Sequence, residues 1–149
     1  MSERLIRIGR VSTINREKGM VTVTYPDLDN SVTDEFPLFS FTDEFKIPKI
    51  GSNVLVLHLS NGQSAGYVLG HYWNNGNNPP DPEAIFRKEM SQNYGEAYIE
   101  FKNGTLTIHA DKIILDGSVT GTKDIVASGK SVIGHTHTDS RGGRTSSPI

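Results

Sequence analysis

The segment EAYIEFKNGTLTIHADKIILDGSVTGTKDIVASGKSVIGH, residues 96–135, decides the fold that we predict for this chain. Short stretches of alternating apolar and polar residues are separated by Asn-Gly, Asp-Gly and Ser-Gly pairs, a pattern typical of very short strands with one apolar face. The alternating apolar residues are few: Ala97, Ile99 and Phe101; Leu106 and Ile108; Ile113 and Leu115; and Ile125. A region of about 40 residues built in this way is too short to close a core by itself.

Residues 96–133 are therefore expected to bury their apolar face against other chains. Stacked β turns that cannot cover their own faces indicate a solenoid or a β-helix shared by several chains. Three copies wound around one axis would bury each inward-facing Ile and Leu at that axis. The pattern alone favours an oligomer without setting the number of chains.

The chain ends in GHTHTDSRGGRTSSPI, residues 134–149, where two histidines stand one residue apart. On a strand His135 and His137 point to the same face and can reach adjacent positions of one metal ion. Two ligands are too few for a structural zinc site, and Asp139 could add an oxygen or be solvated. If three chains meet on an axis, two histidines from each give about six nitrogens, an octahedral set that disfavours zinc and allows iron, nickel or cobalt.

The other histidines, His58, His71 and His109, are interpreted as structural or surface residues. The glycines and serines that follow the pair are expected to let the chain turn back at its end. In that arrangement Pro148 and Ile149 would pack against the shaft.

Residues 1–78 read as a small all-β barrel of the OB type. Strands are expected at 5–14, 20–26, 35–41, 53–59 and 65–72, with turns at 15–19 and 60–63. The stretch NNGNNPPDPE, residues 74–83, has the composition of a linker. Within a linker at 79–95 we expect a possible short helix that begins near Asp81 and ends near Met90.

Composition narrows the function. The chain has 149 residues, no cysteine, and a net charge of -2 from 15 Lys+Arg against 17 Asp+Glu, so no basic field favours nucleic-acid binding. The N-terminus lacks the apolar stretch of a signal peptide. The longest apolar run, Val54–Leu57, is far shorter than the roughly 20 residues of a membrane-spanning helix. We expect a protein that is made in the cytoplasm and is soluble there.

The layout resembles the baseplate assembly protein V family, the central tail spikes of contractile-tailed phages and related tail-like particles. FKIPKIGSNVLVLHLSNGQSAGYVLGHYWNNGNNPP, residues 45–80, is similar to the OB-domain signature of that family. GTLTIHADKIILDGSVTGTKDIVASG, residues 104–129, is similar to its triple-stranded β-helix, and the last 16 residues resemble its apex. The similarity is good over 45–149 and loose over 1–44.

The resemblance implies an N-terminal OB-fold collar (1–78), a linker (79–95), a trimeric intertwined β-helix spike (96–133) and a metal-capped apex (134–149). It implies that His135 and His137 of three chains bind one iron ion. It further implies a homotrimer that docks on the baseplate hub and tail tube, stands at the tail tip of the virion, and punctures the outer envelope of the target cell when the sheath contracts.

Two other readings stay open. A metal hydrolase would need further ligands and a place for water, and the sequence offers no second cluster and no nucleophile or phosphate-loop motif, so we do not expect an enzyme. An OB-fold module for nucleic acid or carbohydrate would use its aromatic rings: Phe36, Phe39, Phe41, Phe45, Tyr67, Tyr72 and Trp73. The particle itself could be a phage, a phage-derived bacteriocin or an injection device.

Overall fold

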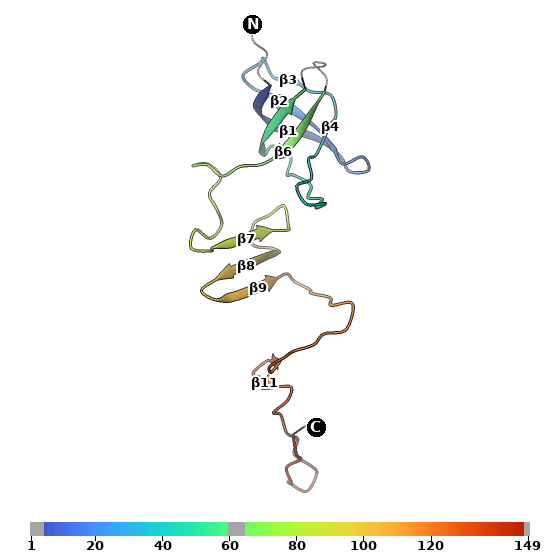
Figure 1. Cartoon of the computed structure of the whole chain (residues 1–149), viewed down its shortest axis with the longest axis vertical. Coiled ribbons are helices and arrows are strands. Elements are labelled where there is room, and N and C mark those ends of the chain that lie inside the picture. The colour runs from blue at the N-terminus through green and yellow to red at the C-terminus, as the bar shows by residue number, and fades with distance from the viewer. Residues whose placement is uncertain (1–4, 60–64, 148–149) are drawn as a thin grey trace. The chain divides into compact units, whose positions relative to one another are not determined.

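The computed structural model describes residues 5–59 and 65–147, and within these ranges the chain is all-β, with eleven strands and no helix (Figure 1). This confirms the all-β part of the predicted fold class. The chain divides into two compact units, residues 1–111 and 112–149. The first contains two sheets, and the second contains a single short hairpin.

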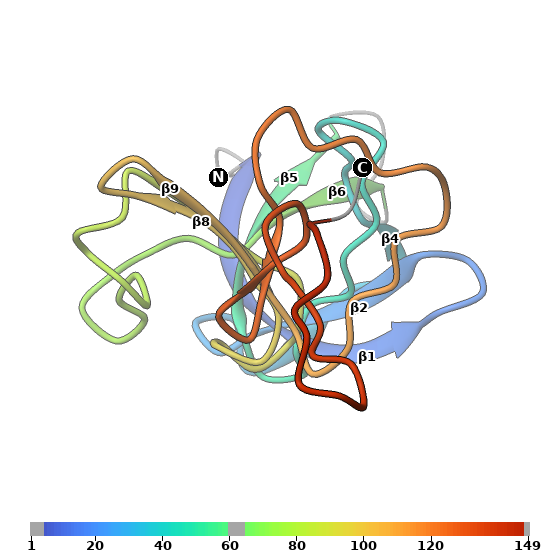
Figure 2. The ribbon, with the colours of Figure 1, turned by 90° about the horizontal axis from the view of Figure 1, so that it is seen from below.

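Six strands form the first sheet: β1 (Ile6–Asn15), β2 (Met20–Tyr25), β3 (Ser31–Val32), β4 (Phe36–Pro37), β5 (Asn53–His58) and β6 (Gly66–Gly70). Its path runs β3-β2-β1-β5-β6, and β4 pairs with β2. A parallel bridge from Leu38 to Val68, with the Phe39 amide donating to the Val68 carbonyl at 2.9 Å, links the end of β4 to β6. The pairings thus close a circuit β1-β2-β4-β6-β5, a small barrel that Figure 2 shows from below.

The barrel holds all of the buried apolar residues among those described: Val11, Val21, Val23, Tyr25, Phe36, Val54, Val56 and Val68. Valine suits this small interior because its branched side chain packs well on a pleated strand. Gly66 is required by close packing, since a Cβ there would lie 2.6 Å from the Leu57 carbonyl oxygen and 2.7 Å from a ring carbon of Phe36. The barrel therefore has a complete core of its own.

The five predicted barrel strands are all present. The stretch expected at 35–41 is paired only over Phe36–Pro37, and the two-residue strand β3 was not predicted. The expected turn at 60–63 lies outside the described residues. In β1 the buried face is that of Gly9 and Val11, and Ile8 on the opposite face is 53% exposed.

The second sheet consists of β7 (Phe86–Glu89), β8 (Tyr98–Lys102) and β9 (Thr105–His109), all antiparallel. The short helix expected from Asp81 to Met90 is wrong, because residues 86–89 pair with β8 along their whole length. Cross-strand pairing here outweighs the N-cap and proline pattern of 81–83. The sheet consequently begins inside the stretch that was assigned to a linker at 79–95.

Residues 103–104 make the tight turn between β8 and β9. Asn103 and Gly104 both have positive φ, 50° and 76°, as a two-residue hairpin turn requires. The Asn-Gly pair in the sequence predicted this hairpin correctly.

The second unit contains β10 (Val126–Ala127) and β11 (Lys130–Ser131), joined at Ser128 and Gly129. The strands expected around Ile113 and Leu115 do not form within one chain, since residues 110–125 take part in no strand. Every residue from 111 to 130 is exposed. Residues 112–147, the described part of this unit, include no buried residue.

Candidate functional site

The three-stranded sheet β7–β9 has one apolar face. Register places Phe86 opposite Phe101 and Phe101 opposite Leu106, while Ile99 lies opposite Ile108 on the same face. This set, which we call the apolar face, consists of Phe86, Ile99, Phe101, Leu106 and Ile108. Phe86 is 52% exposed, Leu106 63% and Ile108 51%. Within the described part of the chain these three side chains are left exposed.

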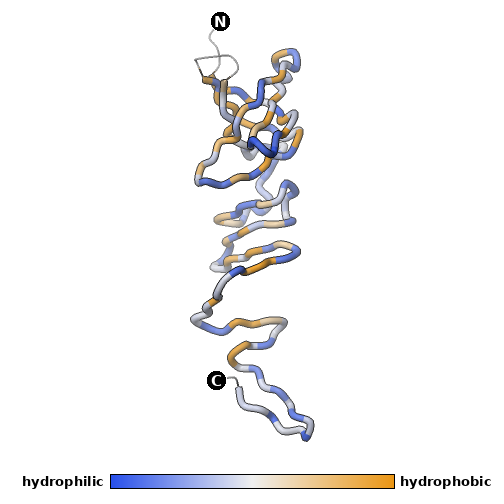
Figure 3. The backbone as a smooth tube through the Cα atoms, turned by 90° about the vertical axis from the view of Figure 1, so that its right-hand side faces the viewer, coloured by the Kyte–Doolittle hydropathy of each residue, from blue (hydrophilic) through white to orange (hydrophobic). Residues whose placement is uncertain are grey.

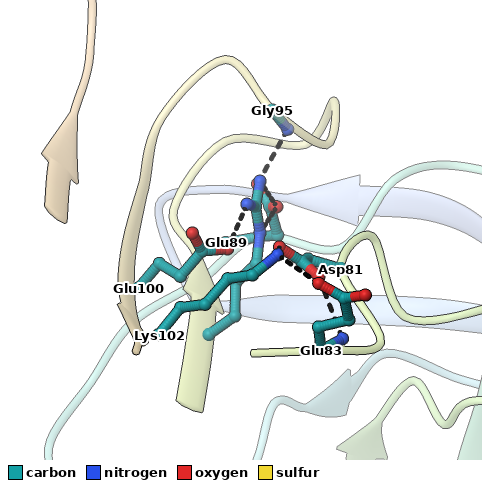
Figure 4. Close-up of polar contacts among 7 residues, drawn as sticks. Asp81, Glu83, Glu89, Gly95, Glu100 and Lys102 are labelled. Carbon is teal, nitrogen blue, oxygen red and sulfur yellow. Dashed lines mark hydrogen bonds and ion pairs between the residues drawn. The ribbon is translucent and has the colours of Figure 1, made fainter. Parts of the chain in front are cut away.

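The opposite face is charged, and its charges are paired within the chain (Figure 4). Arg87 donates to Glu89 and to Glu100, each at 2.7 Å. The Arg87 guanidinium also lies over the Tyr98 ring, 3.6 Å from its centroid. These ion pairs are shielded: the side chains of Arg87, Glu89 and Glu100 are 14%, 4% and 13% exposed. The sheet thus has one face of paired charges and one face that is apolar except for Lys88.

A second ionic group extends this charged face. Lys102 lies 2.9 Å from Asp81 and 3.0 Å from Glu83. Hydrogen bonds to Asp81 and Glu83 raise the pKa of Lys102, and the hydrogen bond from Lys102 holds the pKa of the Asp81 carboxyl below its usual range. Burial by itself lowers the pKa of Arg87, but its hydrogen bonds to Glu100 and Glu89 more than reverse this and raise it.

Glu89 is the only described residue beyond Gly70 that is buried. Besides the Arg87 ion pair it accepts a hydrogen bond from the Gly95 amide at 3.0 Å. A buried carboxylate is stable only when paired and hydrogen-bonded, so Glu89 ties strand β7 to the turn at residues 91–97. The linker prediction for 79–95 missed this network. The signal in the sequence is the pair of stretches FRKE (residues 86–89) and YIEFK (residues 98–102). Both carry charged residues of opposite sign beside apolar ones.

Residues 112–133 carry the largest set of uncovered apolar side chains. The orange stretches near the C-terminal part of the tube in Figure 3 mark them. They are Ile113, Ile114, Leu115, Val119, Ile125, Val126, Val132 and Ile133, each between 46% and 72% exposed. A series of exposed apolar side chains of this size marks a surface that another molecule covers.

The two candidate metal ligands, His135 and His137, lie close together, with ring centroids 5.0 Å apart and planes at 85°. The Nδ1 atom of His135 is 2.9 Å from the carbonyl oxygens of Ser131 and Val132. A carbonyl only accepts, so Nδ1 carries the proton and Nε2 keeps its lone pair. A backbone carbonyl on the distal nitrogen is the usual support of a metal-binding histidine.

One chain cannot complete a metal site from its described part. No three side chains of His, Asp or Glu come together there in a way that could hold an ion. Two nitrogens from each of three chains would supply the six that an octahedral iron, nickel or cobalt site needs.

Asp139 does not join the histidines as a ligand. Its Oδ1 accepts hydrogen bonds from the amides of Arg141 and Gly143 at 2.8 and 2.7 Å, which closes a tight loop. Thr138 and Arg144 form an isolated antiparallel β-bridge, and the Thr145 amide donates a hydrogen bond to the His137 carbonyl at 2.9 Å. The prediction that the chain turns back after the histidines is confirmed for residues 137–145. The predicted packing of Pro148 and Ile149 lies outside the described residues.

The remaining histidines have structural partners, as predicted. The Tyr25 hydroxyl and His58 Nε2 are 2.7 Å apart, and the His109 ring stacks on Tyr98 at 5.0 Å. His71 packs edge-on to Trp73. Burial, with a smaller contribution from Lys46, lowers the pKa of His71.

Several of the aromatic residues singled out in the sequence gather on the barrel surface. Phe39 packs edge-on to Phe41 and to Tyr67, with centroids at 4.9 and 6.3 Å. Phe39, Phe41 and Tyr67 are 46%, 66% and 38% exposed. Phe36, by contrast, is a core residue.

Comparison with protein-family models gives no match for this chain, and comparison with curated proteins gives none either. Among the described residues no helix is long and apolar enough to cross a membrane.

Proposed function

We propose that this chain is the central spike of a contractile tail baseplate, that it acts as a homotrimer, and that it punctures the envelope of the target cell when the sheath contracts. The particle is a phage or a phage-derived bacteriocin or injection device. In this proposal the closed barrel is an OB-type collar that docks on the baseplate hub and tail tube. Residues 96–133 are the β-helix shaft and 134–149 its tip.

The observation that carries the proposal is the coreless second unit. Residues 111–130 are exposed without exception, yet they include a regular supply of Ile, Leu and Val. A disordered tail would be poor in such residues. Three chains around one axis would bury them and would also give strand partners to residues 110–124, which form no strand within one chain.

The position of the histidine pair supports the number three. It follows the uncovered segment directly, at the point where chains wound around one axis would converge. Three pairs would surround one iron ion, and His135 already holds the tautomer in which Nε2 can bind a metal. When bound, the ion would cross-link three chain ends and keep them from fraying.

A shaft of this kind suits mechanical work. Interchain ladder hydrogen bonds and an apolar axis must all break together for it to bend or unfold. The proposed role needs no active site. Among the described carboxylates, Asp81, Glu89 and Glu100 pair with cations, and Asp139 accepts hydrogen bonds from backbone amides.

The test measures the molecular mass and the metal content of the full chain on one sample. Sedimentation equilibrium should give three times the 16.4 kDa chain mass, and elemental analysis should find one iron per three chains. A monomer refutes the spike. One metal ion per chain, or none, refutes the shared site while leaving the trimer standing.

The exposed rings of Phe39, Phe41 and Tyr67 favour a second candidate, a barrel that binds an oligosaccharide or single-stranded nucleic acid by stacking. Titration of the protein with a mixed oligonucleotide and with an envelope oligosaccharide, followed by NMR, separates the two. Saturable binding that Phe41→Ala abolishes would favour the second candidate. No binding leaves the aromatic group as a protein-docking surface of the collar.

A further inference from the structure

We propose that the sheet β7–β9 starts and aligns the assembly of the trimer. Its apolar face docks on the same face of two other copies of the chain before residues 112–133 associate. This inference rests on the proposed trimer and assigns to one element the task of bringing the chains into register.

The sheet is ready before assembly. All three strands pair within one chain, over four residues in β7–β8 and five in β8–β9. Such local pairings form early because little loop entropy is lost in closing them. The charges of the other face are already satisfied, Arg87 by Glu89 and Glu100, and Lys102 by Asp81. The sheet therefore does not wait for a partner chain to complete its polar contacts.

The apolar face is suited to a second and third copy of itself. It consists of Phe86, Ile99, Phe101, Leu106 and Ile108. Apart from Lys88, which pairs with Glu44 of the same chain, the charged residues of the sheet lie on the opposite face, so copies of this face meet without burying an unpaired charge. In the same chain the uncovered apolar segment begins at Ile113, a few residues after β9 ends at His109.

Lys88 is the single charge on the apolar side, where it lies opposite Ile99 in the edge strand β7. It pairs with Glu44 of the same chain. A lysine on an edge strand discourages open-ended pairing with further strands. Lys88 thus protects the sheet against open-ended strand addition at the edge of β7. Association of the apolar faces of three chains is not hindered by it.

The following segment needs such a guide. Residues 110–125 form no strand within one chain, and their sequence alternates apolar and polar residues only weakly. A shift of one residue between paired strands would move the apolar side chains to the outside. If three chains are already held together at the β7–β9 sheet, their residues 110–125 begin to associate in the correct register.

The test is refolding of the full-length chain from denaturant, with trimer formation and trimer dissociation timed separately. Leu106→Ala removes an anchor of the apolar face, and Leu115→Ala removes a comparably exposed residue, 66% against 63%, of the following segment. Thr105→Ala, on the charged face of β9, is the matched control.

We expect Leu106→Ala to slow trimer formation roughly tenfold or more and to change dissociation little, because contacts made in the transition state affect the association step. Leu115→Ala should leave formation unchanged and accelerate dissociation. A Leu106→Ala chain that stays monomeric with its barrel intact by circular dichroism also supports the inference.

Equal slowing by both variants, or slowing by Leu115→Ala alone, overturns it. A natural chain that never forms a trimer refutes the proposed function instead, so the two failures are distinct. Thr105→Ala should match the natural chain in both rates, and slow assembly in that control would show that the charged face takes part.

Discussion

Replacing Arg87 by methionine tests how the charged face of the β7–β9 sheet is held together. Methionine matches the length of arginine's hydrocarbon but leaves the carboxylates of Glu89 and Glu100 without their cation. The Glu89 and Glu100 side chains are only 4% and 13% exposed, so the relevant magnitude is that of a broken buried pair, about 3–5 kcal/mol, and not the ~1 kcal/mol of a surface pair. Loss of the contact with Tyr98 adds to this.

Chemical denaturation at fixed chain concentration measures the effect, since the stability of an oligomer depends on concentration. The free energy of unfolding should fall by about 3–5 kcal/mol per chain in Arg87→Met. Arg87→Lys should recover only part of this loss. The ammonium group of lysine does not reproduce the planar guanidinium, which donates to Glu89 and to Glu100 from different nitrogens.

Combining Arg87→Met with Glu89→Gln and Glu100→Gln should restore stability relative to Arg87→Met alone, because the stranded charges are gone. A loss below about 1 kcal/mol in Arg87→Met would show that these ions are solvated, which would refute the reasoning from their burial.

Three further results are expected. Replacing both His135 and His137 by Ala should remove iron from the purified protein and leave the trimer assembled, as elemental analysis and sedimentation would show; dissociation would place the stability at the tip instead. Burial raises the pKa of Tyr25 from 10.0 to about 12, so barrel stability should be intact below pH 10 and fall as the pH rises to about 12; denaturation midpoints against pH should show this fall in the natural chain and not in Tyr25→Phe. Gly66→Ala should lower the free energy of barrel unfolding by about 1–3 kcal/mol, whereas Gly76→Ala, next to a movable side chain only, should change it by less than about 0.5 kcal/mol in the same titration.

The sequence predicted most of the barrel because its strands alternate clearly and its turns carry Gly and Asn. It could not say which face of β1 is inward. Ile8 is the more hydrophobic residue, but Gly9 is the one that is buried. Gly9 packs so closely on β2 that a Cβ there would lie 2.3 Å from the Val23 side chain. Packing against the neighbouring strands β2 and β5 decides this, and the alternation within β1 alone does not contain that information.

The charged face was missed for a related reason. Pro82 with Asp81 before it is a sound helix start, and Arg87 to Met90 contains good helix formers. The pairing of β7 with β8 overrides this preference, and that pairing depends on contacts between Arg87 and Glu100 that no local pattern reveals. The histidine pair was found because it is local, and the support that Ser131 and Val132 give to His135 was not, because backbone carbonyls leave no mark on sequence.

The uncovered segment at residues 112–133 also has a consequence for the life of the protein in the producing cell. Exposed apolar side chains are what chaperones and proteases recognise. In the proposed trimer these side chains would be exposed in a newly made chain and covered after assembly, so chains without partners would be removed and assembled chains would be spared. The coreless segment would in this way restrict the surviving pool to subunits that are ready for incorporation.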